Sequence, residues 1–534
     1  MTTLAVMRSA FGRRLAHRFV VPVALASTLV VGACAVGPDP GPDVVTGGGG
    51  GGNAPAESST SAQLPALSAP KADLTWRDCG TTTADRYQLA APSDVSIECA
   101  TLDSPVNPDR PDGDTLSVSV TRARVSDTPR DAAPLVLTSG TDLPSSRTLM
   151  LLAAGPGRSL LQQHPVVAID RRGIPESSPL DCLTRAERIS IASNGLTSTP
   201  LDSAARINRL AQSASSGADG CTETLSPNQL AFGVPEAAFD IETLRQKWNV
   251  DRLALLGVGE GSDVVLTYAA NFGGRAGRIV LDTPTPFGAN ARDRAGTAAN
   301  GVQAALTTFA QRCSTLPNCA LGSNGIATIN RVLDKGRTGD LPGLTDTQAL
   351  SAITTAVATT TDAPNGLTPI ASAIAAADRG DTTALRRLAT TAADLRTTDG
   401  QLVARCNDTT GPVGQNEIPG LIDAWTKQYP TTGADAALTL MRCNGWSAGT
   451  AVNPPTSFPA NPLVLNGSGD TINGGAGAAG LTPLFVRAGA DPTTVTWDGL
   501  GYSVVAHTTC AADVVGQYLQ NAPLSGPSQR GCPA

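Results

Sequence analysis

Lysine, histidine and aromatic residues are scarce in this chain of 534 residues. Charged residues make up 16% of the chain, aromatic residues make up 4%, and the formal net charge is −7. Of the 39 basic residues only four are lysines, and no segment gathers enough basic side chains to neutralise a phosphate backbone. This composition argues against nucleic acid as a partner.

Long hydrophobic runs and metal-binding patterns are also missing. After residue 35 there is no run of about 18 apolar residues, which excludes a polytopic transporter. The cysteines never occur as Cys-x-x-Cys, and His164 and His507 are the only histidines beyond the N-terminal segment. The sequence therefore predicts neither a metal site nor a cofactor.

The N-terminus reads as an export signal. Four arginines precede the apolar run 19–31, which ends in Val-Gly-Ala followed by Cys34. A basic segment, a short apolar run and small residues are typical of a secretory signal, and the last four residues resemble the bacterial lipobox. We expect a lipoprotein signal peptide at 1–33 and a lipid on Cys34; the alternative is an ordinary signal peptide with an incidental cysteine.

The predicted lipid places the protein on the outer face of the bacterial cytoplasmic membrane, in the cell envelope. Residues 34–73 are rich in Gly, Pro and Ser and cannot bury a core. We interpret this segment as a tether that holds a folded body away from the membrane.

The other ten cysteines form an even set, which in an exported chain indicates five disulfides. Spacing alone does not determine which cysteines pair. The ten are Cys79, Cys99, Cys182, Cys221, Cys313, Cys319, Cys406, Cys443, Cys510 and Cys532.

From about residue 74, short apolar runs alternate with helical patterns, which is typical of an α/β fold with a mostly parallel, doubly wound sheet. The expected strands are 116–120, 134–137, 166–169, 253–256, 279–281, 463–465 and 495–497. Strand patterns stop in 286–451, where the expected helices are 300–312, 346–361, 366–377, 382–394 and 434–442. We therefore expect a core formed by 74–285 and 452–534, with 286–451 inserted as a helical cap.

Three segments resemble the secreted tripeptidyl-aminopeptidase-like (TAP-like) proteins of the α/β-hydrolase superfamily. The first, 167–182, begins Val-Ala-Ile-Asp-Arg-Arg-Gly and ends Asp-Cys. The second, 255–282, contains Gly-Val-Gly-Glu-Gly, and the third, 443–532, contains Asn-Gly-Ser-Gly-Asp and a closing cysteine. The resemblance implies an α/β-hydrolase fold with a large cap. It also implies that the cysteines pair consecutively, as 79–99, 182–221, 313–319, 406–443 and 510–532.

The residues that catalysis would require have departed from this family pattern. An active member carries its nucleophile in a Gly-x-Ser-x-Gly turn, followed along the chain by an acid and a histidine. By resemblance the nucleophile position is Gly259, the histidine position is Tyr502, and only the acid, Asp470, is retained. A phenol with an ordinary pKa of about 10 is a poor base at neutral pH. Asp142 also stands in the loop that would supply oxyanion donors, where a negative charge opposes catalysis.

These departures predict a catalytically inactive pseudo-hydrolase whose pocket binds a peptide or lipid-like ligand, or whose body serves as a scaffold for another envelope protein. The alternative is an active aminopeptidase or esterase with a relocated triad, built on Ser262 and His507, or with Glu260 as nucleophile. Ser262 lies one helical turn beyond the elbow, which argues against the relocation.

A dinucleotide site is a further alternative, because Gly257-x-Gly259-x-x-Ser262 follows a strand and Asp282 lies twenty residues beyond Ser262. The third position is serine rather than glycine or alanine. The motif also lies in the middle of the predicted sheet rather than after its first strand. Both features argue against this interpretation.

Overall fold

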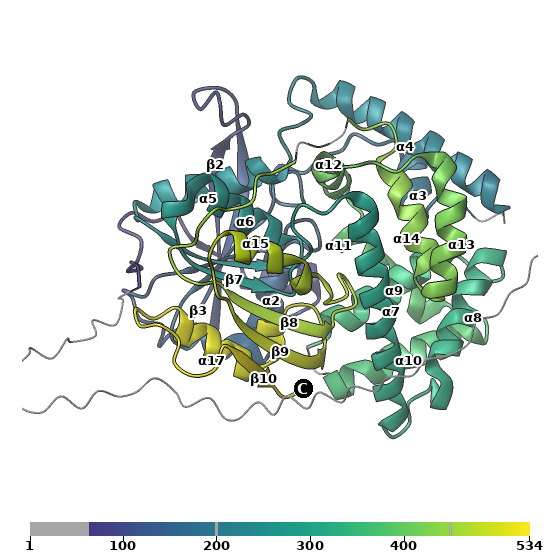
Figure 1. Cartoon of the computed structure of the whole chain (residues 1–534). Coiled ribbons are helices and arrows are strands. Elements are labelled where there is room, and N and C mark those ends of the chain that lie inside the picture. The colour runs from purple at the N-terminus through teal and green to yellow at the C-terminus, as the bar shows by residue number, and fades with distance from the viewer. Residues whose placement is uncertain (1–63, 198–200, 362, 448, 450) are drawn as a thin grey trace, which may run out of the picture. The chain divides into compact units, whose positions relative to one another are not determined.

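Among the described residues, a ten-stranded sheet forms the part of the molecule on the left of Figure 1, in the order β1-β2-β3-β5-β4-β6-β7-β8-β9-β10. The strands are β1 (Arg77–Asp78), β2 (Val95–Pro105), β3 (Thr115–Val125), β4 (Leu135–Thr138), β5 (Val166–Ile169), β6 (Leu253–Val258), β7 (Ala276–Asp282), β8 (Leu463–Gly469), β9 (Thr493–Leu500) and β10 (Gln529–Cys532). The pairs β1–β2, β2–β3 and β3–β5 are antiparallel, and all other pairs are parallel. The predicted α/β-hydrolase fold is confirmed.

The computed structural model describes residues 64–197, 201–361, 363–447, 449 and 451–534, all of which belong to one unit, Thr60–Ala534. The predicted signal peptide, Cys34 and most of the predicted tether lie outside these residues. None of the helices in the described ranges is long and apolar enough to cross a membrane.

The predicted tether extends too far towards the C-terminus. The Lys71 amide donates to the Trp248 carbonyl at 2.9 Å, and Arg278 Nη1 donates to the Pro65 carbonyl at 2.9 Å. Leu74 is buried in the core. The folded body therefore already includes the last residues of the segment 34–73.

Each apolar run that was expected as a strand coincides with one, although β4 begins at Leu135 rather than at residue 134. In β4, Val136 packs into one hydrophobic cluster, whereas Leu135 and Leu137 pack into another on the opposite face of the sheet. A strand buried on both faces needs apolar side chains at consecutive positions, which explains the continuous runs. The sequence did not predict β1, β2 or β10; β2 alternates buried and exposed residues, as an antiparallel strand with one solvated face does.

Helices cover both faces of the sheet (Figure 1). The helices α5 (Val234–Trp248) and α6 (Gly261–Phe272) contribute to the first hydrophobic cluster. The helices α2 (Ser145–Ala154), α16 (Val504–His507) and α17 (Thr509–Tyr518) contribute to the second. The short helices α1 (Gly80–Tyr87) and α15 (Thr482–Arg487) complete the core.

The segment expected as a cap is helical, and no strand occurs in the described residues between 286 and 451. Its α-helices are α7 (Ala291–Thr315), α8 (Gly325–Thr338), α9 (Asp346–Thr359), α10 (Ala363–Asp378), α11 (Thr383–Arg396), α12 (Asp399–Asp408), α13 (Ile418–Gln428) and α14 (Gly433–Thr439). A third hydrophobic cluster lies among α7 to α11.

Two helices that precede the elbow also pack on the cap. These are α3 (Arg185–Ala192) and α4 (Ser203–Leu225), which the sequence assigned to the core. Arg206 of α4 forms an ion pair with Asp346 of α9 at 2.8 Å. The boundary expected at residue 286 therefore misses part of the cap, because an amphipathic pattern does not show which partner its apolar face meets.

The five disulfides are those implied by the family resemblance: 79–99, 182–221, 313–319, 406–443 and 510–532. Cys182–Cys221 joins the loop before α3 to α4, and Cys406–Cys443 joins α12 to the 3₁₀ turn Leu440–Cys443. The first bond thus ties together segments that pack on the cap, and the second joins two elements of the cap itself.

Candidate functional site

The strand β6 turns sharply into α6 at Gly259, where φ is +56°. The Gly259 amide donates to the Asp282 carbonyl at 2.9 Å. A Cβ atom on Gly261 would lie 2.0 Å from the Thr138 carbonyl oxygen, so this position requires glycine. The predicted strand–elbow–helix is therefore present, with the backbone of a nucleophile elbow.

A carboxylate from another loop occupies the space of the missing nucleophile. Asp142 follows β4, and its Oδ2 lies 2.0 Å from the place where a Cβ on Gly259 would stand. Asn473 Nδ2 lies 2.3 Å from the same place, and Tyr502 Cε2 lies 3.0 Å from it. No side chain fits at this elbow while Asp142 and Asn473 keep these positions.

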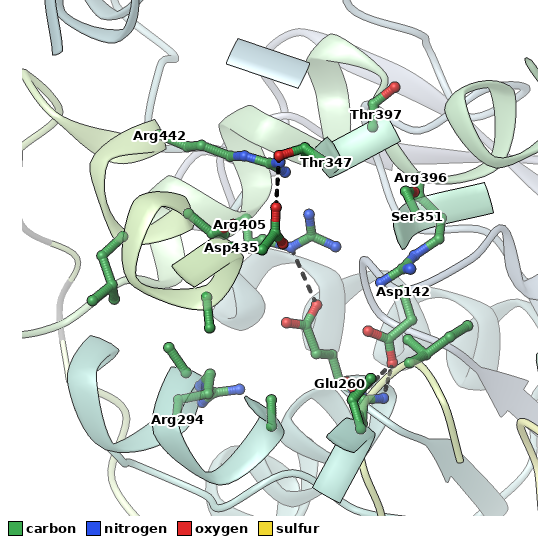
Figure 2. A pocket seen from close by; sticks show the side chains of 18 of the residues that line it. Asp142, Glu260, Arg294, Thr347, Ser351, Arg396, Thr397, Arg405, Asp435 and Arg442 are labelled. Atoms are coloured by element: carbon green, nitrogen blue, oxygen red, sulfur yellow. Dashed lines mark hydrogen bonds and ion pairs between the residues drawn. The ribbon is translucent and has the colours of Figure 1, made fainter. Parts of the chain in front are cut away.

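Asp142 also binds the backbone donor that an active enzyme would use (Figure 2). Its Oδ2 accepts from the Glu260 amide at 2.9 Å, from Asn473 Nδ2 at 2.6 Å and from the Tyr502 hydroxyl at 3.2 Å. The amide that follows the nucleophile position is one of the two oxyanion donors of an α/β-hydrolase. The chain thus fills both the nucleophile space and part of the oxyanion site with its own carboxyl group.

Burial sets the protonation of the acids behind the elbow. Burial, assisted by the nearby charge of Glu260, raises the pKa of Asp142 to about 7. Burial also raises the pKa of Asp470 to about 8. Burial and the two aspartates raise the pKa of Tyr502 above its ordinary value, so its hydroxyl remains a donor at neutral pH.

Asp470 occupies the position of the catalytic acid, but the histidine that this acid would orient is missing. Its Oδ1 accepts from the Ile472 amide at 2.7 Å, whereas its Oδ2 is buried with no hydrogen-bond partner among the described residues. The hydroxyl of Tyr502 is directed instead to Asp142 and to the Val258 carbonyl, at 3.1 Å from the latter. An unpartnered carboxyl oxygen is what remains when the imidazole that it would orient is replaced.

The structure does not bring the residues of the predicted alternative triad together. Ser262 Oγ donates to the Gly257 carbonyl at 3.1 Å and is fully buried. The two ring nitrogens of His507 lie 2.9 Å from the Ser503 and Thr360 carbonyl oxygens. Since each nitrogen already faces a carbonyl, neither is directed to a serine hydroxyl.

The residues of the dinucleotide alternative also have other partners. The Asp282 carboxyl accepts from the Val504 amide at 2.8 Å and from the Val505 amide at 3.0 Å, so it holds the start of α16. The turn at Gly259, where a pyrophosphate would approach, is occupied by Asp142. Neither arrangement fits a nucleotide.

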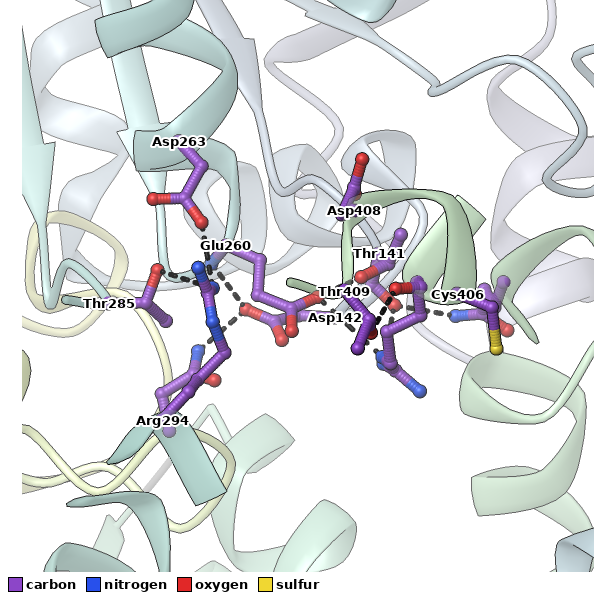
Figure 3. Close-up of polar contacts among 12 residues, drawn as sticks. Thr141, Asp142, Glu260, Asp263, Thr285, Arg294, Cys406, Asp408 and Thr409 are labelled. Carbon is purple, nitrogen blue, oxygen red and sulfur yellow. Dashed lines mark hydrogen bonds and ion pairs between the residues drawn. The ribbon is translucent and has the colours of Figure 1, made fainter. Parts of the chain in front are cut away.

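Glu260 projects from the elbow towards the cap. Its Oε2 accepts a short hydrogen bond from Thr141 Oγ1 and lies 3.7 Å from Arg405 Nε of α12. Nearby, Arg294 of α7 binds Asp263 at 2.7 Å and approaches Thr285 Oγ1 at 3.4 Å (Figure 3). These contacts connect the turn of the core directly to two cap helices.

A cavity of about 330 Å³ lies above the elbow. Asp142 and Glu260 line its core side (Figure 2), together with Asn473, Thr471, Ile472 and Thr285. Most of the remaining lining comes from α3 and from the cap helices. In the part of the chain that the structure describes, no group of three or more His, Cys, Asp or Glu side chains could hold a metal ion.

Sequence reasoning missed Asn473 and the direction of Asp142. Asn473 lies three residues beyond Asp470 in the loop after β8, and nothing in its local pattern distinguishes it from a turn residue. The hydrogen bond between Asn473 and Asp142 joins residues 331 positions apart. Such a contact leaves no signal in a single sequence.

Comparisons with known proteins agree with this fold and with the C-terminal elements. Residues 429–530 match the family described as TAP-like protein. Serine protease Hip1 of Mycobacterium tuberculosis is 25% identical over 230 residues, which cover 42% of this chain and 43% of that protein. Hip1 of Mycobacterium bovis gives the same values. The matched region thus spans less than half the length of these relatives.

Among solved structures, proline iminopeptidase of Mycobacterium smegmatis has a TM-score of 0.36 and 13% identity, covering 79% of this chain and 97% of that protein.

Proposed function

Because the chain is a TAP-like member of the α/β-hydrolase superfamily, we propose that it is a pseudo-hydrolase, which has kept the fold and the pocket and has lost the chemistry. In this proposal the protein is an envelope lipoprotein that binds a ligand beneath its cap. The observation that carries it is Asp142 Oδ2, which fills the nucleophile space and accepts from the Glu260 amide.

The arrangement supports inactivity through three separate losses. There is no nucleophile at Gly259, no imidazole at position 502, and a carboxyl group rather than a substrate oxygen on the Glu260 amide. Losing one oxyanion donor alone typically costs about 2.7–4 kcal/mol of transition-state stabilisation. The residual Asp470 has no partner to orient and supplies no catalysis by itself.

We expect the unmodified chain to hydrolyse neither p-nitrophenyl butyrate nor aminoacyl p-nitroanilides above the rate in buffer. Steady-state kinetics at pH 7–8 measures this, with Ser262→Ala as the matched control that should behave identically. Turnover by the unmodified chain that Ser262→Ala or His507→Ala abolishes would establish the relocated triad and overturn the proposal.

The proposed membrane anchor depends on Cys34. We expect Cys34→Ser to move the protein from the membrane fraction of the native host to the soluble exported fraction, because no acyl chains are then attached. Fractionation together with mass spectrometry of the mature N-terminus measures this. A mature N-terminus at another residue, without a diacylglyceryl group, contradicts the anchor.

A further inference from the structure

Three arginines from three separate segments of the cap surround the cavity above the elbow: Arg396 at the end of α11, Arg405 in α12 and Arg442 in the turn Leu440–Cys443 (Figure 2). Polar partners hold each of them. Arg442 Nε donates to Asn194 Oδ1 at 2.7 Å, Arg405 Nη2 donates to the Thr141 carbonyl at 3.1 Å, and Arg396 Nη1 lies 3.4 Å from Thr355 Oγ1. The cavity is therefore lined by positioned guanidinium groups.

Two of these guanidinium groups lack a carboxylate. Within the described ranges, no carboxylate oxygen lies within 4.0 Å of Arg396 or Arg442, and Arg396 Nε is buried without a hydrogen-bond partner. Arg188 and Arg294 line the same cavity but form ion pairs at 2.7 Å with Asp399 and Asp263. Both side chains are half-buried. A guanidinium group that is partly withdrawn from water is stabilised by an anion, so this pair of arginines is suited to bind one.

The acids that face the cavity form no ion pair with Arg396 or Arg442 among the described residues. Asp435 accepts from Thr347 Oγ1 at 2.7 Å and from Asn194 Nδ2 at 2.9 Å, and burial raises its pKa. Glu260 lies 3.7 Å from Arg405, and Asp142 is held in the elbow. Asp435 stabilises the charge of Arg442 without forming an ion pair, and Asp142, Asp470 and Glu260 do the same for Arg396. Arg396 Nε nevertheless keeps an unpartnered donor among the described residues.

The rest of the lining is mainly apolar and comes from helices. It includes Ile191, Ala295, Ala298, Val302, Leu350 and Leu440. An extended peptide gains affinity from free backbone donors and acceptors along a strand edge, which helical walls do not offer. The volume of about 330 Å³ lies within the range of small-molecule sites.

We infer that this cavity binds a single-chain amphiphile whose anionic head group lies between Arg396 and Arg442 and whose alkyl chain packs on the apolar helical wall. The inference rests on the proposed function, since it assigns the ligand class of the same pocket. Charge-assisted hydrogen bonds to two guanidinium groups would fix the head group, and burial of methylene groups would fix the chain.

Isothermal titration calorimetry of the complete protein with four C12 probes below their micellar concentrations tests the inference. We expect dodecanoate or dodecyl phosphate to bind at least tenfold more tightly than dodecanol, and dodecyltrimethylammonium to bind most weakly. The tighter of the two anions identifies the head group. Each methylene removed from that anion should weaken binding about three- to fourfold.

Variants locate the head group. Arg396→Met and Arg442→Met should each weaken binding of the anion about ten- to a hundredfold and leave dodecanol binding unchanged. The control is Arg387→Met, an exposed arginine of the same helix as Arg396, which should change neither value. Thermal melts identify any variant that does not fold. The comparison of the four probes on the unmodified protein tests the inference even if a variant does not fold.

Equal affinity for the anions and for dodecanol, or no binding of any probe, overturns the inference. Anion binding that is unaffected by both cavity arginine variants also overturns it. Incubation of the same protein with p-nitrophenyl dodecanoate tests the proposed function separately. Hydrolysis of this ester contradicts inactivity, whatever the calorimetry shows.

Discussion

A chain that carries Asp142→Gly, Gly259→Ser and Tyr502→His together is expected to react with one equivalent of a fluorophosphonate probe, whereas the unmodified chain is expected not to react. Removing the Asp142 carboxyl frees the Glu260 amide and most of the space above Gly259. It also releases Asn473, whose Nδ2 is held 2.3 Å from the place of the new Cβ by its hydrogen bond to Asp142. The histidine introduced at position 502 lies near Asp470, whose buried Oδ2 is free to accept from it. Nucleophile, base, acid and one oxyanion donor are then present together.

Variants that carry only some of these three substitutions should not react with the probe, because Asp142 and the new side chain at position 259 would occupy the same space. Gly259→Ser alone places a Cβ 2.0 Å from Asp142 Oδ2, at a residue with φ of +56°. Overpacking of this kind costs about 1–3 kcal/mol of folding stability. Adding Tyr502→His to Gly259→Ser leaves that collision in place, so this pair should not be labelled.

Intact-protein mass spectrometry after incubation with the probe measures the outcome. The matched control carries Gly259→Ala with the other two changes, which keeps the new side-chain volume without the hydroxyl. Labelling of the Gly259→Ser single variant would show that Asp142 does not obstruct the elbow. Equal labelling of the alanine control would show that the probe reacts at another residue, which also contradicts the prediction.

The free energy of unfolding is expected to fall as the pH rises from about 5 to 8. Asp142 and Asp470 have folded pKa values of about 7 and about 8, above the value of about 3.9 expected in the unfolded chain. Between these values the native state binds more protons than the unfolded state, so raising the pH favours unfolding. Each group contributes up to about 1.4 kcal/mol per pH unit within its own interval.

Asp470→Asn should remove the contribution of Asp470, because an amide stays neutral and its oxygen can still accept from the Ile472 amide. Relative to the unmodified chain, the variant should gain stability as the pH rises from 5 to 8. Chemical denaturation at a series of pH values measures this. Asp498→Asn, at an exposed position of β9, is the control, and a variant that follows the unmodified curve would contradict the burial argument.

The sheet and the elbow were predictable from sequence because their causes are local. Strands such as Leu253–Val258 are buried on both faces and read as continuous apolar runs. The elbow glycines appear at fixed spacing because the backbone at Gly261 approaches Thr138 too closely for a side chain. Both signals can be read within a few residues.

The filled state of the elbow could not be predicted, because its contacts join distant parts of the chain. Sequence placed a negative charge in the oxyanion loop at Asp142 but gave no direction for its side chain. Its partners Glu260, Asn473 and Tyr502 lie 118, 331 and 360 residues away along the chain. From sequence alone, Gly259→Ser with Tyr502→His is the smallest set of substitutions expected to restore labelling by the probe. The structure shows that Asp142 must be replaced as well.

The arginines of the cap escaped prediction for the same reason. Arg396, Arg405 and Arg442 lie on separate elements, and each resembles an ordinary helix residue in the sequence. The cavity exists only where those elements meet above the elbow. A single sequence does not indicate that these elements lie next to one another in the fold.

The backbone amide resonance of Glu260 tests the central claim, that the carboxyl of Asp142 occupies the elbow, most directly. In protein labelled with ¹⁵N at glutamate, this resonance should titrate with a midpoint of about 7, the pKa of the Asp142 carboxyl that accepts its proton. In Asp142→Asn the titration should vanish. A Glu260 amide shift that is independent of pH in the unmodified protein, or that titrates unchanged in Asp142→Asn, would contradict the account.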